Sequence, residues 1–102
     1  MFKKNKSVKC LDGFEVSMQA SSYNYCDPRT DTGPYTSVEL GYPSAADDLI
    51  MKYAEDDSKP TETVYGWVPC SVVSLLIAKH GGMVEGELPE GVPVLKPMTE
   101  LS

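Results

Sequence analysis

The alternation of hydrophobic and polar residues predicts two strands in the first half of the chain. Over residues 13–20 every second residue is apolar, which is the period of a half-buried strand whose polar face is in water. Over residues 35–42 the period returns, with Val38, Leu40 and Tyr42 expected on one face. The intervening segment is rich in proline and turn-forming residues and predicts a loop. The two strands are expected to pair antiparallel as an exposed hairpin arm.

The run VYGWVPCSVVSLLIAKHGG, residues 64–82, predicts a strand that feeds directly into the main helix. Its first residues are β-branched or aromatic, which favours a strand, and Pro69 has the fixed φ of a first helical turn. Apolar residues then recur at three- and four-residue spacing, which places them on one side of a helix. Gly81 is suited to the left-handed end of a helix. The main helix is therefore expected at about residues 69–80.

A short second helix is predicted at about residues 44–53. Ser44 can cap its free backbone donors, and Asp47 stands three residues on, in the reciprocal position near the positive end of the helix dipole. Ile50 and Tyr53 would then face the core. The polar segment after this helix is expected to be a surface loop that returns the chain to the strand at residue 64.

These elements together predict an α+β fold, in which a small antiparallel sheet packs on one main helix. With 102 residues the chain has the size of one ordinary domain, large enough to bury roughly two thirds of its unfolded surface. Residues 10–82 are expected to form that domain. Residues 1–9 are expected to be a flexible basic N-terminus, and the proline and glycine content of residues 83–102 predicts an extended tail.

Charge and cysteine content narrow the classes of function. The formal net charge of −6 would repel the phosphate backbone, so direct nucleic-acid binding is not expected. No apolar stretch approaches the ~20 residues of a membrane span, and the basic start lacks the apolar run of a signal peptide. Three cysteines are an odd number for a disulfide framework. A cytoplasmic protein with free thiols, and no contact with a membrane, is therefore predicted.

Cysteine and histidine allow a thiol or metal site, but their spacing does not favour one. Cys10, Cys26, Cys70 and His80 are zinc-binding types, yet none lies in a CxxC knuckle. Cys70 and His80 stand at opposite ends of the predicted helix, about 15 Å apart at 1.5 Å per residue. A helix N-terminus lowers a thiol pKa, so Cys70 is a candidate nucleophile, whereas packing as a half-buried residue is the simpler interpretation. No metal, cofactor or catalytic residue is predicted.

The acidic residues indicate a surface rather than a catalytic centre, because they lack the ligand spacing and central glycine of a calcium loop. A solvated acidic face is the default expectation. Such a face could complement a basic partner, or mimic nucleic-acid phosphates toward a DNA- or RNA-binding protein. The residues assigned to it are Asp47, Asp48, Glu55, Asp56 and Asp57.

Tyrosine supplies the candidate for partner contact. The chain has six tyrosines, two phenylalanines and one tryptophan. Tyr23, Tyr25 and Tyr35 flank the CDPRTDTGP loop, and with Arg29 they would make a patch of amphipathic anchors around a polar tip. The alternative is that some of these tyrosines complete the core, with their hydroxyls at its edge.

The runs GFEVSMQASSYNYCDPR, GPYTSVELGYPS and TVYGWVPCSVVSLLIAKHGG resemble small uncharacterised proteins encoded by tailed phages and prophages of bacteria. The resemblance covers most of residues 10–82, and its motifs are structural, with no known activity attached. It implies the cytoplasm of an infected or lysogenic bacterium as the setting. Short acidic proteins of this kind are more often binders than enzymes.

The expected function is a non-enzymatic protein-binding module that acts on a host or phage protein. The first alternative is an acidic nucleic-acid mimic that inhibits a DNA- or RNA-binding protein. The second alternative is a small thiol-dependent or metal enzyme. An open edge of so small a sheet would also allow a homodimer.

Overall fold

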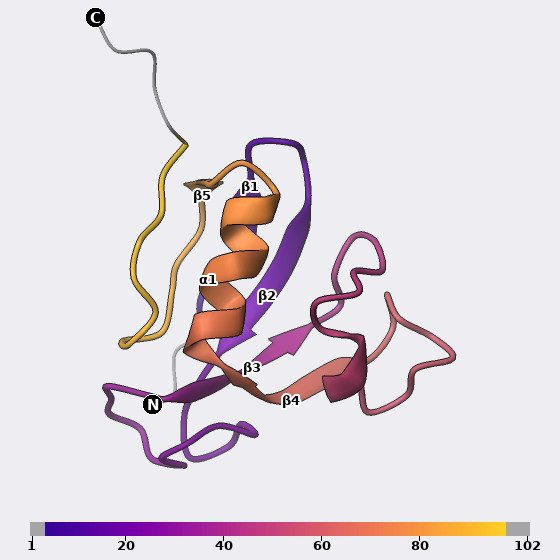
Figure 1. The fold of residues 1–102 in the computed structure, drawn as a ribbon. Coiled ribbons are helices and arrows are strands. Elements are labelled where there is room, and N and C mark those ends of the chain that lie inside the picture. The colour runs from indigo at the N-terminus through magenta and orange to yellow at the C-terminus, as the bar shows by residue number, and fades with distance from the viewer. Residues whose placement is uncertain (1–3, 98–102) are drawn as a thin grey trace, which may run out of the picture.

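Five short strands form one antiparallel sheet in a computed structural model, which describes residues 4–97 (Figure 1). The strands are β1 (Val8–Cys10), β2 (Glu15–Gln19), β3 (Ser37–Gly41), β4 (Val64–Pro69) and β5 (Met83–Glu85). Their order across the sheet is β4-β3-β2-β1-β5. The helix α1 (Cys70–Lys79) covers one face, and a turn of 3-10 helix, η1 (Met51–Tyr53), precedes β4. The α+β fold is confirmed.

The core lies between α1 and the sheet, and its residues follow the two predicted periods. In α1, the residues Val73, Leu76 and Ile77 are buried at the spacing of one helical face. In the central strands the buried aliphatic and thioether side chains are Val16, Met18, Val38 and Leu40. The strand β4 passes directly into α1, but Pro69 has an extended ψ of 142° and ends the strand rather than opening the helix. Gly81, at φ 92°, ends the helix as expected.

The strands β2 and β3 pair antiparallel as predicted, but they do not form an exposed arm. They are the central strands of the sheet, flanked by β1 and β4, so the expected hairpin arm is wrong. Tyr42 was expected on the same face as Val38 and Leu40, both of which are buried. Instead it has a φ of 51° and is 61% exposed, because the left-handed backbone breaks the alternation at the end of β3.

The short helix expected at residues 44–53 does not form, and η1 is the one helical turn of that segment. The backbone N–H of Ser44 donates to the Glu15 carbonyl at 2.7 Å, and the Ser44 hydroxyl accepts the N–H of Glu15 at 2.9 Å. Ser44 therefore binds β2 instead of capping a helix. The carboxylate of Asp47 accepts the N–H of Leu49 at 2.9 Å, which closes a local turn.

Both ends of the described chain belong to the domain, beyond the expected limits of residues 10 and 82. The strand β1 begins at Val8, and the N–H of Asn5 donates to the side chain of Gln19 at 2.8 Å. The strand β5 pairs with β1, and the buried Val92 joins the core after it. Residues 1–3 and 98–102 lie outside the described part of the chain.

Each outer edge of the sheet is at least partly covered by the chain itself. Along β4, the N–H of Glu55 donates to the Val64 carbonyl at 2.9 Å, and Ala54 forms a bridge with Tyr65. At β5, the N–H of Met83 donates to the Leu95 carbonyl at 2.7 Å. The open edge from which a homodimer was expected is therefore partly occupied within residues 4–97, and the homodimer itself stays a prediction.

Gly86 and Gly13 offer a matched test of how closely the C-terminal segment packs on β1. Both have positive φ, 116° and 97° respectively. A Cβ at Gly86 would lie 2.3 Å from the backbone oxygen of Ser7, whereas one at Gly13 would meet nothing within 4 Å. We expect Gly13→Ala to cost about 1 kcal/mol through its φ alone. Gly86→Ala should cost about 2 kcal/mol more, because the two backbones must separate. Equal shifts of the urea-unfolding midpoint would contradict this packing.

Candidate functional site

An exposed aromatic cluster, formed by Tyr25, Arg29 and Trp67, joins β4 to the loop that follows β2. Trp67 is 50% exposed. Its ring stacks on that of Tyr25, with 4.9 Å between centroids and 25° between planes. The guanidinium of Arg29 lies 5.4 Å from the centroid of the Tyr25 ring, which is within the range of a cation–π interaction. We refer to these three residues as the aromatic cluster.

A β-bulge in β4 positions Trp67. Val38 pairs with Val68 and Leu40 pairs with Tyr65, so two residues of β4, Gly66 and Trp67, stand opposite one residue of β3. Trp67 has a φ of 51°, in the left-handed region that bulky residues rarely adopt. The extra residue re-aims the backbone, and the Trp67 side chain is thereby presented to solvent.

Tyr25 is held from two sides. Its N–H donates to the carboxylate of Glu39 at 2.8 Å, and its carbonyl accepts the N–H of Trp67 at 2.9 Å. A Cβ on Gly66 would lie 3.2 Å from the Cβ of Tyr25, so a residue without a side chain allows Tyr25 to lie this close to β4. The backbone of Tyr25 is therefore positioned by the fold, and its ring lies against Trp67.

The four residues of the predicted patch do not all share one surface. Tyr25 and Arg29 are brought together, and Tyr23 is an exposed residue of the same loop. Tyr35, in contrast, is only 6% exposed, and its hydroxyl donates to the Thr30 carbonyl at 2.8 Å. Tyr35 is therefore not an exposed anchor of the patch, because its ring supports the loop from within. Trp67 was missed, although the glycine before it, Gly66, lies inside a strand pattern and is a signal for a bulge.

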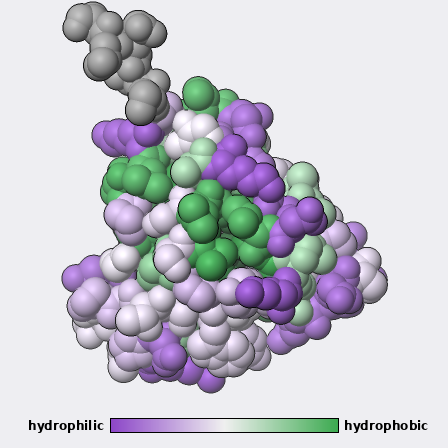
Figure 2. All heavy atoms as spheres, in the orientation of Figure 1, coloured by the Kyte–Doolittle hydropathy of each residue, from purple (hydrophilic) through white to green (hydrophobic). Residues whose placement is uncertain are grey.

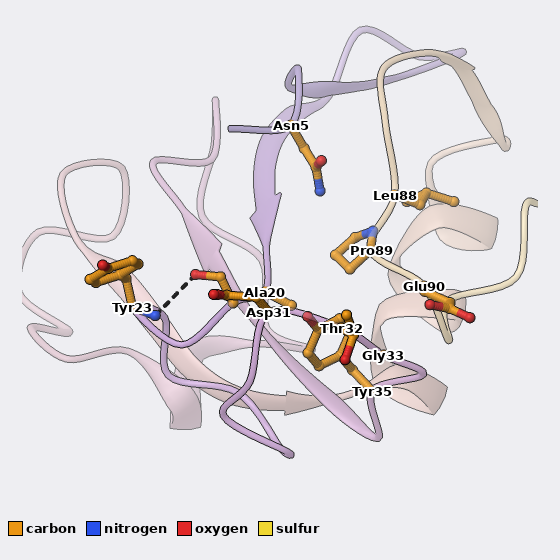
Figure 3. Close-up of a pocket in the computed structure, with 11 residues that line it drawn as sticks. Asn5, Ala20, Tyr23, Asp31, Thr32, Gly33, Tyr35, Leu88, Pro89 and Glu90 are labelled. Carbon is orange, nitrogen blue, oxygen red and sulfur yellow. Dashed lines mark hydrogen bonds between the residues drawn. The ribbon is translucent and has the colours of Figure 1, made fainter. Parts of the chain in front are cut away.

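A cavity of about 570 Å³ opens between this loop and the C-terminal segment (Figure 3). Tyr35 lines it from the loop, and Leu88, Pro89 and Glu90 line it from the C-terminal segment. Its charged lining residues are Asp31 and Glu90, both acidic. Asp31 accepts hydrogen bonds at 2.8 Å from both the N–H and the hydroxyl of Ser22, and these bonds lower the pKa of its carboxyl. The charge of the cavity lining therefore favours a cationic group.

One of the five residues assigned to the acidic surface, Asp47, is buried. Asp48, Glu55, Asp56 and Asp57 are exposed. Asp47 is 4% exposed, and its carboxylate faces inward toward the end of α1. Its assignment to a solvated acidic face was therefore wrong. A buried carboxylate needs hydrogen-bond or charge partners, and the charged partners of Asp47 lie far from it in the sequence.

Asp47 belongs to a charged cluster that the sequence interpretation did not identify. His80 Nε2 lies 2.7 Å from the carboxylate of Asp47, and His80 Nδ1 lies 2.7 Å from the carboxylate of Asp12. Lys79 Nζ donates to the other oxygen of Asp47 at 3.0 Å. The imidazole also stacks on the ring of Phe14, with 4.0 Å between centroids. The cluster joins the turn after β1, the segment before η1 and the end of α1.

The two carboxylates beside His80 favour its imidazolium form. Burial opposes its charge, but the hydrogen bonds to Asp12 and Asp47 outweigh burial and raise the pKa of His80. Burial likewise opposes the charge of Asp47, while hydrogen bonds from Leu49, His80 and Lys79 outweigh it and lower the pKa of that carboxyl. Both nitrogens of His80 are engaged, so neither offers a lone pair to a substrate. The arrangement is suited to holding the turn after β1 and the segment before η1 against the end of α1, rather than to general base catalysis.

The three cysteine thiols have raised pKa values, including Cys70 at the start of α1. Burial raises the pKa of Cys70, and its Sγ donates to the Tyr35 carbonyl at 3.2 Å. Cys70 is half-buried, as the simpler interpretation predicted, and the lowered pKa that its alternative role as a nucleophile would need is not found. Burial, followed by the charge of Asp12, raises the pKa of Cys10 to about 11. Burial raises that of Cys26 as well.

A second exposed apolar area lies over α1, where Figure 2 shows hydrophobic side chains gathered on this face of the molecule. Leu75 is the exposed large hydrophobic residue of α1, and Val94 of the C-terminal segment is exposed as well. Neither has the left-handed backbone found at Trp67. Leu75 therefore provides a control position for tests of the aromatic cluster.

No protein-family model, curated protein or solved structure matches this chain. Across residues 4–97, no group of three or more histidine, cysteine, aspartate or glutamate side chains is arranged to hold a metal ion. Within the same residues, no helix has the length and apolar character that a membrane span requires.

Proposed function

We propose that the protein is a non-enzymatic protein-binding module and that the aromatic cluster is its contact surface. The observation that carries the proposal is Trp67, a bulky residue that is half exposed and held at a φ of 51°. A left-handed backbone costs a residue with a side chain roughly 1–2 kcal/mol. Backbone strain of this kind is found preferentially at functional sites.

Two properties of the cluster suit it to binding. Tryptophan, tyrosine and arginine are the residues that most often dominate the energy of protein interfaces. The rings of Trp67 and Tyr25 have few rotamers to lose, and the backbone of Tyr25 is already held by Glu39 and by the N–H of Trp67. A surface that is ordered before binding loses less conformational entropy when the partner docks.

The setting of this activity rests on the resemblance to phage and prophage proteins. We infer that the module acts in the cytoplasm of a bacterium, on a protein of the host or of a phage. The net charge of −6 favours partners of opposite charge. The acidic lining of the cavity beside the loop supports the same preference.

Neutralising the cavity should weaken partner binding if a basic side chain of the partner enters it. We expect Asp31→Asn combined with Glu90→Gln to lower the affinity about tenfold, which corresponds to about 1.4 kcal/mol. Asparagine at position 31 keeps the oxygen that accepts from Ser22. The control Asp57→Asn with Glu62→Gln removes the same charge from exposed positions. Equal losses in titrations of both double variants would show only a general charge effect.

Capture from bacterial lysate tests the proposed surface. The tagged wild-type protein is compared with the double variant Tyr25→Ala and Trp67→Ala, and with the control Leu75→Ala. We expect one nuclease-resistant protein, enriched at near-equal amount by wild type and control but lost from the double variant. A captured protein that the double variant retains would contradict this surface. A protein captured only with nucleic acid would favour the nucleic-acid mimic.

A further inference from the structure

We propose that His80 is a proton-operated latch, which holds the turn after β1 against the end of α1 and releases it when the imidazolium loses its proton. The two carboxylates of Asp12 and Asp47 each lie 2.7 Å from a different nitrogen of His80. An imidazolium has two N–H donors and can satisfy both. A neutral imidazole has one N–H, so its second nitrogen would present a lone pair to a carboxylate oxygen.

The surroundings determine which carboxylate is released. The Asp47 side chain is 2% exposed, and it also accepts from Lys79 and from the N–H of Leu49. Moving that carboxylate away from its partners would leave a buried charge unpaired. The Asp12 side chain is 51% exposed and can turn into water. The neutral imidazole should therefore keep Asp47 and release Asp12.

Other groups near His80 do not replace its proton. Lys79 is occupied with Asp47, and Phe14, which stacks on the imidazole, is uncharged. Cys10 of β1 feels the charge of Asp12, but with a pKa of about 11 its thiol stays protonated over the relevant range. The charge at the junction is thus set by Asp12, Asp47, Lys79 and His80.

The shifted pKa values of His80, Asp12 and Asp47 determine the pH range over which the latch contributes to stability. The pKa of His80 is raised above its ordinary 6.5, so its contribution to stability is complete below pH 6.5 and is lost as the pH rises through the raised value. The carboxyls of Asp12 and Asp47 have pKa values lowered from 3.8, so their contribution is complete above that pH and is lost as the pH falls through the lowered values. The latch is closed between these limits.

Opening of the latch should loosen only the contact between the turn and α1. Two amides of the turn cross this contact, since Leu11 N–H donates to the Gly82 carbonyl at 2.9 Å and Asp12 N–H donates to the His80 carbonyl at 3.2 Å. The N–H of Cys10 donates to Phe14 within the hairpin, at 2.8 Å, and serves as an internal reference. The Leu49 amide reports on the Asp47 side.

Amide hydrogen exchange, measured by NMR across the titration of His80, tests the latch. We expect the protection factors of Leu11 and Asp12 to fall at least tenfold above the titration midpoint, while those of Cys10 and Leu49 stay constant. In Asp12→Asn, which keeps the oxygen that accepts from Phe14, protection of the turn should no longer change with pH.

Unchanged protection at Leu11 and Asp12 in the wild type would overturn the latch, as would a loss confined to Leu49. These wild-type results decide the matter even if Asp12→Asn does not fold. The measurement involves no partner, so failure of the latch would leave the aromatic cluster untouched.

Discussion

Replacing Asp47 with alanine should lower the free energy of unfolding by about 3 kcal/mol, the loss expected when one member of a buried ion pair is removed. The carboxylate accepts from His80 at 2.7 Å and from Lys79 at 3.0 Å. It also closes the turn at Leu49. Its removal leaves His80, which is largely buried, with one carboxylate in place of two, and opens the connection between α1 and the segment before η1. Urea unfolding at pH 6 measures the loss.

Asp48→Ala is the matched control, because Asp48 is the next residue, carries the same charge and is exposed. We expect this change to alter the free energy of unfolding by no more than about 0.5 kcal/mol. Asp47→Asn should fall between the two, since asparagine keeps an acceptor for the Leu49 amide but not the negative charge. Equal effects of Asp47→Ala and Asp48→Ala would show that the buried cluster contributes nothing to stability.

Replacing Trp67 with glycine should remove partner binding without unfolding the domain. Glycine tolerates a φ of 51°, so relief of roughly 1 kcal/mol of strain offsets the lost stacking on Tyr25, which is worth about 0.5–1.5 kcal/mol. We expect unfolding midpoints close to those of the wild type. Affinity should fall by at least about 2 kcal/mol, or roughly thirtyfold, as for the central residues of other interfaces.

Tyr42→Gly separates the backbone effect from the surface effect. Tyr42 is also an exposed aromatic residue at φ 51°, but it lies at the end of β3 and makes no stacking contact in the described structure. Glycine there should raise the free energy of unfolding by roughly 1 kcal/mol and leave affinity unchanged. Binding lost equally in both variants would mean that backbone flexibility, and not the tryptophan, controls affinity.

The sequence predicted those parts of the fold that depend on local periodicity. The strands around Val16 and Val38 and the helix that begins after Pro69 are examples, because side-chain period and local turn chemistry determine them. The short helix failed because Ser44, a good helix cap, binds Glu15 of β2 instead. The two residues lie 29 positions apart in the chain, so a local sequence pattern cannot predict their contact.

The candidate site was predicted only in part for the same reason. Tyr25 and Arg29 were identified because aromatic and basic residues flank a loop. Trp67 comes beside them only through a bulge whose register depends on pairing with β3. Asp47 and Asp48 are adjacent residues of the same type, so the sequence does not indicate which of them is buried. Asp47 is the buried one because it pairs with Lys79 and His80 at the end of α1.

The emission of Trp67 gives the most direct test of the proposed contact surface, because it is the one tryptophan of the chain. At 50% exposure it is accessible to a dissolved quencher in the free protein. With a captured partner that lacks tryptophan, or whose tryptophan is replaced, saturation should shift the emission to shorter wavelength and protect it from iodide quenching. Unchanged emission and quenching at saturation would place the contact elsewhere and contradict the proposal.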